Sequence, residues 1–173
     1  MSQWSSHTFE LFPGRTLSLV AVAAPLERIH AAVIARALDV ALLDPSVIVD
    51  TRCILVAANK ALHAAAHTKM RSASLHGELV LCLYARRNVG DALRALGATK
   101  SSAVALVAVF DADAATMEHV ESLADGSLAD AASIITRATD ESRVRALYGI
   151  TLGEVGSLSD AVIGRIALQD ISP

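Results

Sequence analysis

Two histidines and one cysteine in the middle of the chain are the residues best suited to chemistry. His63 and His67 are four residues apart, and on a helix this spacing can place two imidazoles on one metal ion. Cys53 stands close to a predicted helix start, where the pKa of a thiol can fall far enough to give a nucleophile. Neither a third metal ligand nor a general base is evident nearby. A small metal-dependent or thiol enzyme is therefore one hypothesis, and surface histidines with a core cysteine are the simpler interpretation.

Other catalytic signatures are missing from the sequence. It contains neither a GxGxxG nor a GxxxxGK[ST] phosphate loop, no GxSxG turn for a nucleophilic serine, and no CxxC pair for a zinc ribbon. Aromatic residues make up only 3% of the chain, so an extensive surface for stacking bases is not available. Any nucleic-acid contact would therefore rely on phosphate, backbone and a small apolar pocket.

The composition indicates a globular protein with an unusually low charge. Hydrophobic residues make up 53% of the 173 residues and charged residues only 19%. The mean hydropathy is +0.46, but no uninterrupted apolar run reaches the roughly 18 residues of a membrane-spanning helix. The first six residues lack the basic and then apolar order of a secretory signal, and both cysteines lie in apolar stretches. We therefore expect a soluble intracellular protein with free thiols.

The charges are segregated along the chain. Residues 52–100 carry eight basic and two acidic side chains, whereas residues 101–173 carry four basic and eleven acidic ones. The net charge of −3 is an average over these opposed regions. A basic middle can meet phosphate, and an acidic remainder can maintain solubility.

The elements that must position these residues alternate between strands and helices. Apolar runs rich in β-formers predict strands over residues 15–22, 78–84 and 103–110. Helical spacing and capping residues predict helices over 51–67, 89–96, 112–124, 140–148 and 153–169. We expect one domain over residues 1–173, of the α/β (α+β) class, in which several helices cover a small mixed sheet.

Three stretches go beyond general patterns. The first is residues 44–63 (DPSVIVDTRCILVAANKALH), the second residues 69–81 (KMRSASLHGELVL), and the third residues 88–97 (NVGDALRALG). In this order and spacing they resemble the PRPK-binding protein family, which supplies a small accessory subunit of the KEOPS complex. Residues 156–167 (GSLSDAVIGRIA) resemble the last helix of that family.

This resemblance implies a protein that is not an enzyme and uses no cofactor. KEOPS installs threonylcarbamoyl on the adenosine adjacent to the anticodon of tRNA, and another subunit carries out that reaction. The resemblance implies that the chain binds the kinase-like ATPase subunit and the 3′ tail of tRNA. It further implies a cytoplasmic and nuclear location, with neither a membrane nor a small-molecule substrate as partner.

The same resemblance suggests which residues contact each partner. An RNA-facing surface is expected on the C-terminal half of one helix, the following loop and the start of the next strand, at Lys60, Lys69, Arg71, Ser74 and His76. For the kinase contact we favour the C-terminal helix, where Val162 and Ile166 share a face. Those two side chains could equally pack into the protein's own core. A protein-binding module without any RNA contact is a further alternative.

Overall fold

The computed structural model covers the whole chain and describes residues 3–23, 25–67, 69–86 and 88–169. Five strands form one sheet: β1 (Ser5–Thr8), β2 (Thr16–Ala23), β3 (Ala41–Leu43), β4 (Val104–Phe110) and β5 (Leu128–Ala129). The strand order is β1-β2-β4-β3, and β5 pairs with β2. Every pairing is antiparallel, whereas a mixed sheet was expected. The predicted combination of a small sheet with covering helices, the α+β class, is confirmed.

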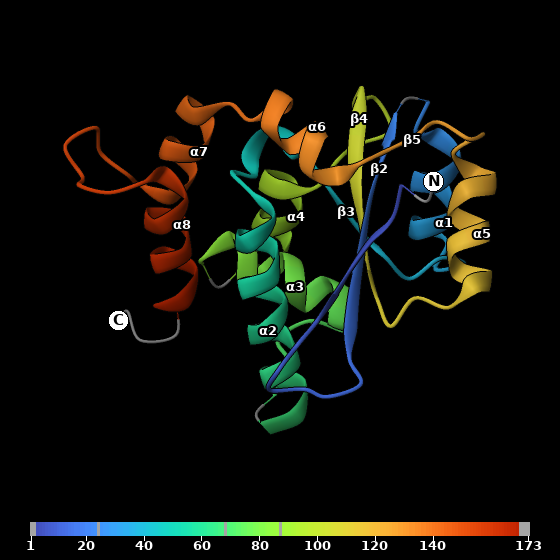
Figure 1. Ribbon diagram of the computed structural model, residues 1–173, viewed down its shortest axis with the longest axis horizontal. Helices are drawn as coiled ribbons and strands as arrows, with labels where there is room; N and C mark the ends of the chain where they lie inside the picture. The colour runs from blue at the N-terminus through green and yellow to red at the C-terminus, as the bar shows by residue number, and fades with distance from the viewer. Residues whose placement is uncertain (1–2, 24, 68, 87, 170–173) are drawn as a thin grey trace.

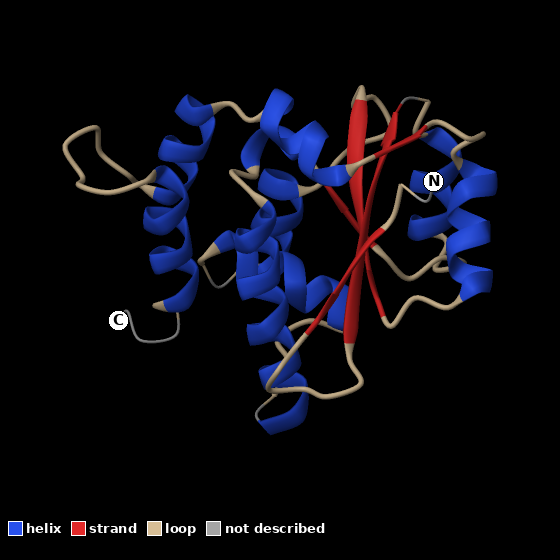
Figure 2. Cartoon of the chain, in the orientation of Figure 1, coloured by secondary structure: helices blue, strands red, loops and turns tan. Residues whose placement is uncertain are grey.

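The helices cover the two faces of the sheet unequally. Helices α1 (Glu27–Ile34) and α5 (Ala114–Leu123) lie against one face. The larger layer on the other face is built from α2 (Thr51–His67), α3 (Leu75–Tyr84), α4 (Val89–Leu96), α6 (Ala131–Ala138), α7 (Glu141–Tyr148) and α8 (Leu158–Ala167). Figure 2 shows this arrangement, with the sheet between the two helical layers. A short 3₁₀ turn, η1 (Pro45–Val47), leads from β3 toward α2. Within the described residues, no helix is both long and apolar enough to cross a membrane.

Alternation along the central strands divides the hydrophobic core in two. Leu17 and Leu19 of β2 face the larger helical layer, while Val20 and Val22 of the same strand face α1 and α5. This division follows from the two-residue period of a strand, which points successive side chains to opposite faces. Both faces of β2 are therefore apolar, as expected for a strand covered on each side.

Helix α3 replaces a predicted strand and lies at the centre of the larger layer. Residues 78–84 were expected to be a strand, but the helix runs from Leu75 to Tyr84. The prediction was wrong because a continuous apolar run has no period, and such a run fits a buried strand and a wholly buried helix equally well. The residue that indicates a helix lies just before this apolar run. The Ser74 side chain accepts a hydrogen bond from the Gly77 amide and caps the helix.

The C-terminal helix is shorter than its pattern predicted. Residues 153–169 were expected to be helical, whereas α8 begins at Leu158, after its N-cap Ser157. Residues 151–157 instead form a loop that projects from the molecule between α7 and α8 (Figure 1). The helices predicted over 51–67, 89–96, 112–124 and 140–148 are confirmed to within one or two residues at their ends.

Candidate nucleic-acid interface

A buried carboxylate determines the shape of the basic loop between α2 and α3. Glu78, in the first turn of α3, has a side chain that is 0% exposed. Its Oε2 atom accepts hydrogen bonds from the backbone amides of Arg71 (2.7 Å) and Ser72 (2.9 Å). The Arg71 side chain adds a bond from its Nε to Oε1 at 3.3 Å. Burying a charged group costs free energy unless the group is paired and hydrogen-bonded. The loop must therefore keep this conformation whenever α3 is packed against the rest of the protein.

The serines of the loop close the same small network. The hydroxyl of Ser72 donates to the carbonyl oxygen of Ser74 at 2.6 Å. The hydroxyl of Ser74 in turn accepts from the Gly77 amide at 3.0 Å. Residues 71–74 are thus held by the first turn of α3 through both main-chain and side-chain bonds. The predicted contact residue Ser74 is a helix cap in this arrangement.

His76 is almost completely buried and holds three elements together. Its Nε2 accepts a hydrogen bond from the Phe110 amide at the end of β4, at 3.0 Å. Its Nδ1 lies 3.0 Å from Oδ1 of Asp39, but away from the N–H direction, so this contact is electrostatic and not a well-formed hydrogen bond. Burial lowers the pKa of His76 despite the opposing effect of Asp39. The ring is therefore neutral at physiological pH and supplies no positive charge for phosphate.

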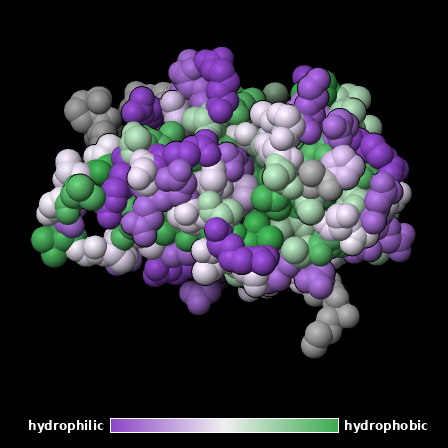
Figure 3. Space-filling model, turned by 90° about the horizontal axis from the view of Figure 1, so that it is seen from above, coloured by the Kyte–Doolittle hydropathy of each residue, from purple (hydrophilic) through white to green (hydrophobic). Residues whose placement is uncertain are grey.

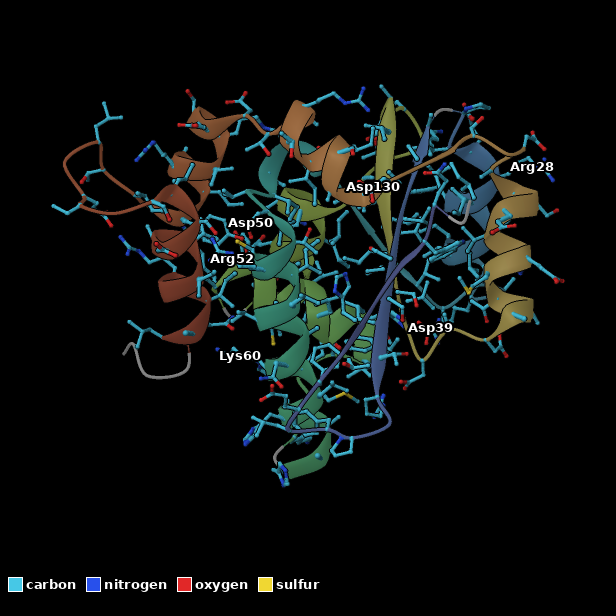
Figure 4. All side chains as sticks on the ribbon, viewed as in Figure 1. Arg28, Asp39, Asp50, Arg52, Lys60 and Asp130 are labelled. Atoms are coloured by element: carbon cyan, nitrogen blue, oxygen red, sulfur yellow. The ribbon has the colours of Figure 1, made fainter. Side chains whose placement is uncertain are left out.

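An acidic cleft lies beside this histidine. Asp39 and Asp113 line it together with His76 and His119. Figure 4 shows Asp39 at the lower part of the sheet, on the side of α1 and α5. Two carboxylates make this cleft a poor place for a polyanion.

The two lysines of the predicted surface have different environments. Lys60, on α2, donates from Nζ to the Ile166 carbonyl in the last turn of α8, at 2.7 Å, and is half-buried. This position suits a cation, because the C-terminal carbonyls of a helix carry partial negative charge. Figure 4 shows Lys60 where α2 lies alongside α8. Lys69 is exposed and has no carboxylate within ion-pair distance in the described part of the chain.

The five predicted RNA-facing residues are not equally available, and Lys60 is directed to α8 whereas His76 is directed to β4. They come from the C-terminal half of α2, the loop and the first turn of α3, where the start of a strand had been expected. Lys69 is exposed and about a third of the Arg71 side chain remains accessible. Lys60, Ser74 and His76 are engaged in bonds that support neighbouring elements.

Val162 and Ile166, favoured for a kinase contact, lie in the core. They are 1% and 0% exposed and belong to the larger hydrophobic cluster. An amphipathic pattern shows that a helix has an apolar face, but not whether that face covers its own protein or a partner. In this structure α8 packs its apolar face on α2, and these two side chains are not available to another protein.

Exposed hydrophobic side chains instead occur on the loop before α8. Leu152 and Val155 are 88% and 102% exposed. Glu154 between them accepts from the Thr151 amide at 3.1 Å and pairs with Arg165 of α8 at 2.8 Å. Glu154 thus attaches the loop to α8, although the apolar side chains of the loop face solvent. Figure 3 shows hydrophobic atoms at the outer edge of the molecule where this loop projects.

A polar cluster joins the N-terminal ends of α2 and α8. Asp50 accepts from the Cys53 amide at 3.3 Å and from Nη2 of Arg52 at 3.1 Å, and the Ser159 hydroxyl also donates to it. Burial alone would raise the pKa of Asp50, but the bonds from Ser159 and Arg52 outweigh it and lower the pKa. Figure 4 shows Asp50 and Arg52 on the side of α2 toward α8. The sequence does not indicate the bond between Asp50 and Ser159, because the two residues are 109 positions apart.

The residues proposed for enzymatic chemistry are not assembled into a site. The rings of His63 and His67 are exposed, with centroids 4.9 Å apart. In the described ranges, no group of three or more His, Cys, Asp or Glu side chains is placed to hold a metal ion. Burial, followed by the nearby charge of Asp50, raises the pKa of the Cys53 thiol to about 11, which is the opposite of what a nucleophile needs.

Comparison with known proteins identifies the family of this chain. The sequence model of the kinase binding protein CGI-121 family matches residues 22–170, and the chain belongs to that family. A curated relative from Danio rerio, the EKC/KEOPS complex subunit TPRKB, is 35% identical over 136 residues. The alignment covers 76% of this chain and 77% of the relative.

Replacing the buried carboxylate tests whether it shapes the loop. In Glu78→Gln an amide N–H₂ must face either the backbone donors or the Arg71 guanidinium, so at least one hydrogen bond is lost. We expect the free energy of unfolding to fall by about 1–3 kcal/mol in urea titrations. The matched control is Glu118→Gln on the exposed side of α5, for which we expect a change within about 0.5 kcal/mol. Equal stability of the two variants would contradict the structural role of Glu78.

The state of Cys53 can be measured directly. Because burial raises its pKa to about 11, the thiol should remain protonated up to about pH 9 in the native protein. The ultraviolet absorbance of thiolate, compared between the natural chain and Cys53→Ser, should show no Cys53 contribution below that pH. A thiolate at neutral pH would instead support the thiol-enzyme hypothesis.

Proposed function

We propose that this chain is a non-catalytic accessory subunit of a KEOPS complex. It binds the kinase-like ATPase subunit and the 3′ end of tRNA, and so supports threonylcarbamoyl modification of the adenosine next to the anticodon. The observation that carries this proposal is the family match over residues 22–170, joined by a KEOPS relative aligned along about three quarters of both chains. Such a subunit acts with its complex in the cytoplasm and nucleus and needs no cofactor.

The RNA contact is assigned to the basic loop. Lys69 and the accessible part of Arg71 supply cations to backbone phosphates of the unpaired 3′ tail. Because Glu78 and Ser74 hold the loop in one conformation, these cations are positioned before the RNA arrives. Preorganisation of this kind reduces the entropy lost on binding. Lys60 and His76 support the surface by fixing α8 and the end of β4 against α2 and α3.

The kinase contact is assigned to the loop of residues 151–157 and the adjoining exterior of α8. Val162 and Ile166 keep their apolar face in the core and thereby hold α8 in place. Leu152 and Val155 then project from an ordered loop that Arg165 and Glu154 attach to this helix. Ordered and fully exposed apolar side chains are well suited to enter a hydrophobic depression on a partner.

Charge reversal of the exposed lysine tests the RNA contact. Lys69→Glu should lower the affinity for a tRNA transcript and reduce the slope of log affinity against log salt by about one. Lys100→Glu, an equally exposed lysine outside the loop, is the control and should change little. Fluorescence anisotropy over a salt series would measure both. Removing the 3′ tail of the transcript should abolish the difference between the two variants; if it persists, the tail is not what Lys69 contacts.

Polar substitution in the projecting loop tests the kinase contact. Leu152→Ser combined with Val155→Ser should weaken the complex with the ATPase subunit by about tenfold or more, because two apolar side chains would lose their burial. Thermal stability should remain unchanged, since both side chains are exposed in the free protein. Ile34→Ser on α1 is the control, an exposed apolar residue on the other side of the sheet. Unchanged affinity in calorimetric titrations would place the kinase contact elsewhere.

A further inference from the structure

Two arginines line a surface hollow that is separate from the basic loop. The hollow has a volume of about 400 Å³ and lies where the C-terminal end of α3 meets η1, α4 and α7. Arg86 and Arg143 line it from different elements. Between them the surface is mostly apolar, with Val47, Ala95 and Leu147. It is open to solvent, which suits a segment of an extended polymer better than an enclosed small molecule.

Arg86 is held by an aromatic ring and by no carboxylate. Its guanidinium carbon lies 5.8 Å from the centroid of the Tyr84 ring, which is close enough for a cation–π interaction. In the described residues, no Asp or Glu lies within ion-pair distance of it. A guanidinium attracted to a ring face in this way keeps its N–H donors available for an anion.

The guanidinium of Arg143 is held by two neighbouring side chains and remains partly exposed to solvent. Its Nη1 donates to Oδ2 of Asp44 at 3.3 Å and also to the Ser46 hydroxyl. Its side chain is nevertheless 52% exposed, and its Nε and Nη2 have no hydrogen-bond partner among the described residues. With Asp44 counted against the two arginines, the hollow keeps one net positive charge.

We propose that this hollow binds a backbone phosphate of tRNA, as a second contact beyond the basic loop. The inference rests on the proposed function, because it takes tRNA as the ligand. Two guanidinium groups provide the planar donor geometry that matches phosphate oxygens, and the apolar floor between them can cover a ribose. Ten residues of α3 separate the hollow from the loop by about 15 Å, so the two sites contact different phosphates.

Arginine-to-glutamine variants of the full chain test the second contact. Arg86→Gln, Arg143→Gln and the double variant should each lower the affinity for a tRNA transcript, by about three- to tenfold per arginine, and reduce the salt slope by about one per arginine. Arg86→Lys should retain part of the affinity, because it keeps the charge but loses the planar fork. Thermal unfolding of each variant would check that the fold is intact.

Arg28→Gln is the matched control. Its side chain is 53% exposed and paired with one aspartate, much like Arg143, but it lies on α1 at the other side of the sheet (Figure 4). We expect no change in tRNA affinity. A transcript without the 3′ tail, measured at low salt, should lose the effect of Lys69→Glu but keep that of the arginine variants, since the hollow contacts another part of the RNA.

The outcomes separate this inference from the proposed function. If the natural chain binds tRNA and Lys69→Glu weakens it while both arginine variants behave like Arg28→Gln, the second contact is wrong and the function stands. If the arginine variants weaken the ATPase complex and leave tRNA affinity unchanged, the hollow faces a protein and the inference is overturned. If the natural chain binds no tRNA, the RNA part of the function fails together with the second contact.

Discussion

The hydrogen bonding of the Glu78 carboxylate is the constraint on which the candidate interface depends. This side chain is 0% exposed, and its position on α3 places it among apolar neighbours. A charge there is tolerable only when donors surround it, and the amides of Arg71 and Ser72 with the Arg71 guanidinium supply them. The packing of α3 and the conformation of the basic loop therefore depend on each other. A change in either one would expose the Glu78 carboxylate or leave it buried without its hydrogen-bond donors.

This coupling explains why several expected contact residues have structural roles. A loop that presents cations to RNA must resist their mutual repulsion and keep its shape in the absence of ligand. Ser74 caps α3, and His76 accepts a hydrogen bond from β4 while remaining neutral. Lys60 stabilises the end of α8. A resemblance between sequences preserves residue types at positions, and it does not distinguish a residue that touches a ligand from one that positions its neighbour.

The sequence was sufficient to predict the elements whose patterns have a period. The helix over 51–67 follows from a 3.6-residue repeat of apolar side chains, and its bounds were correct. Helix α3 could not be identified in this way, because burial on every side removes its period. The partners of His76 could not be predicted from the sequence either. Asp39 and Phe110 lie on segments separated from it by long stretches of chain, and only the folded sheet brings them together.

Complete burial of α3 also explains how a chain with net charge −3 can present two basic surfaces. The buried side chains of this helix are apolar apart from the hydrogen-bonded His76 and Glu78, and the nearby arginines lie beyond its ends. Arg71 precedes the helix and Arg86 follows it, so each end carries a basic group. Electrostatic attraction is screened over about 8 Å at physiological salt, whereas the 17 residues of α2 alone extend about 25 Å. The acidic side chains on the α5 side of the sheet therefore contribute little at either basic surface. For a protein of this size, the local arrangement of charge decides whether RNA is attracted, and the net charge does not.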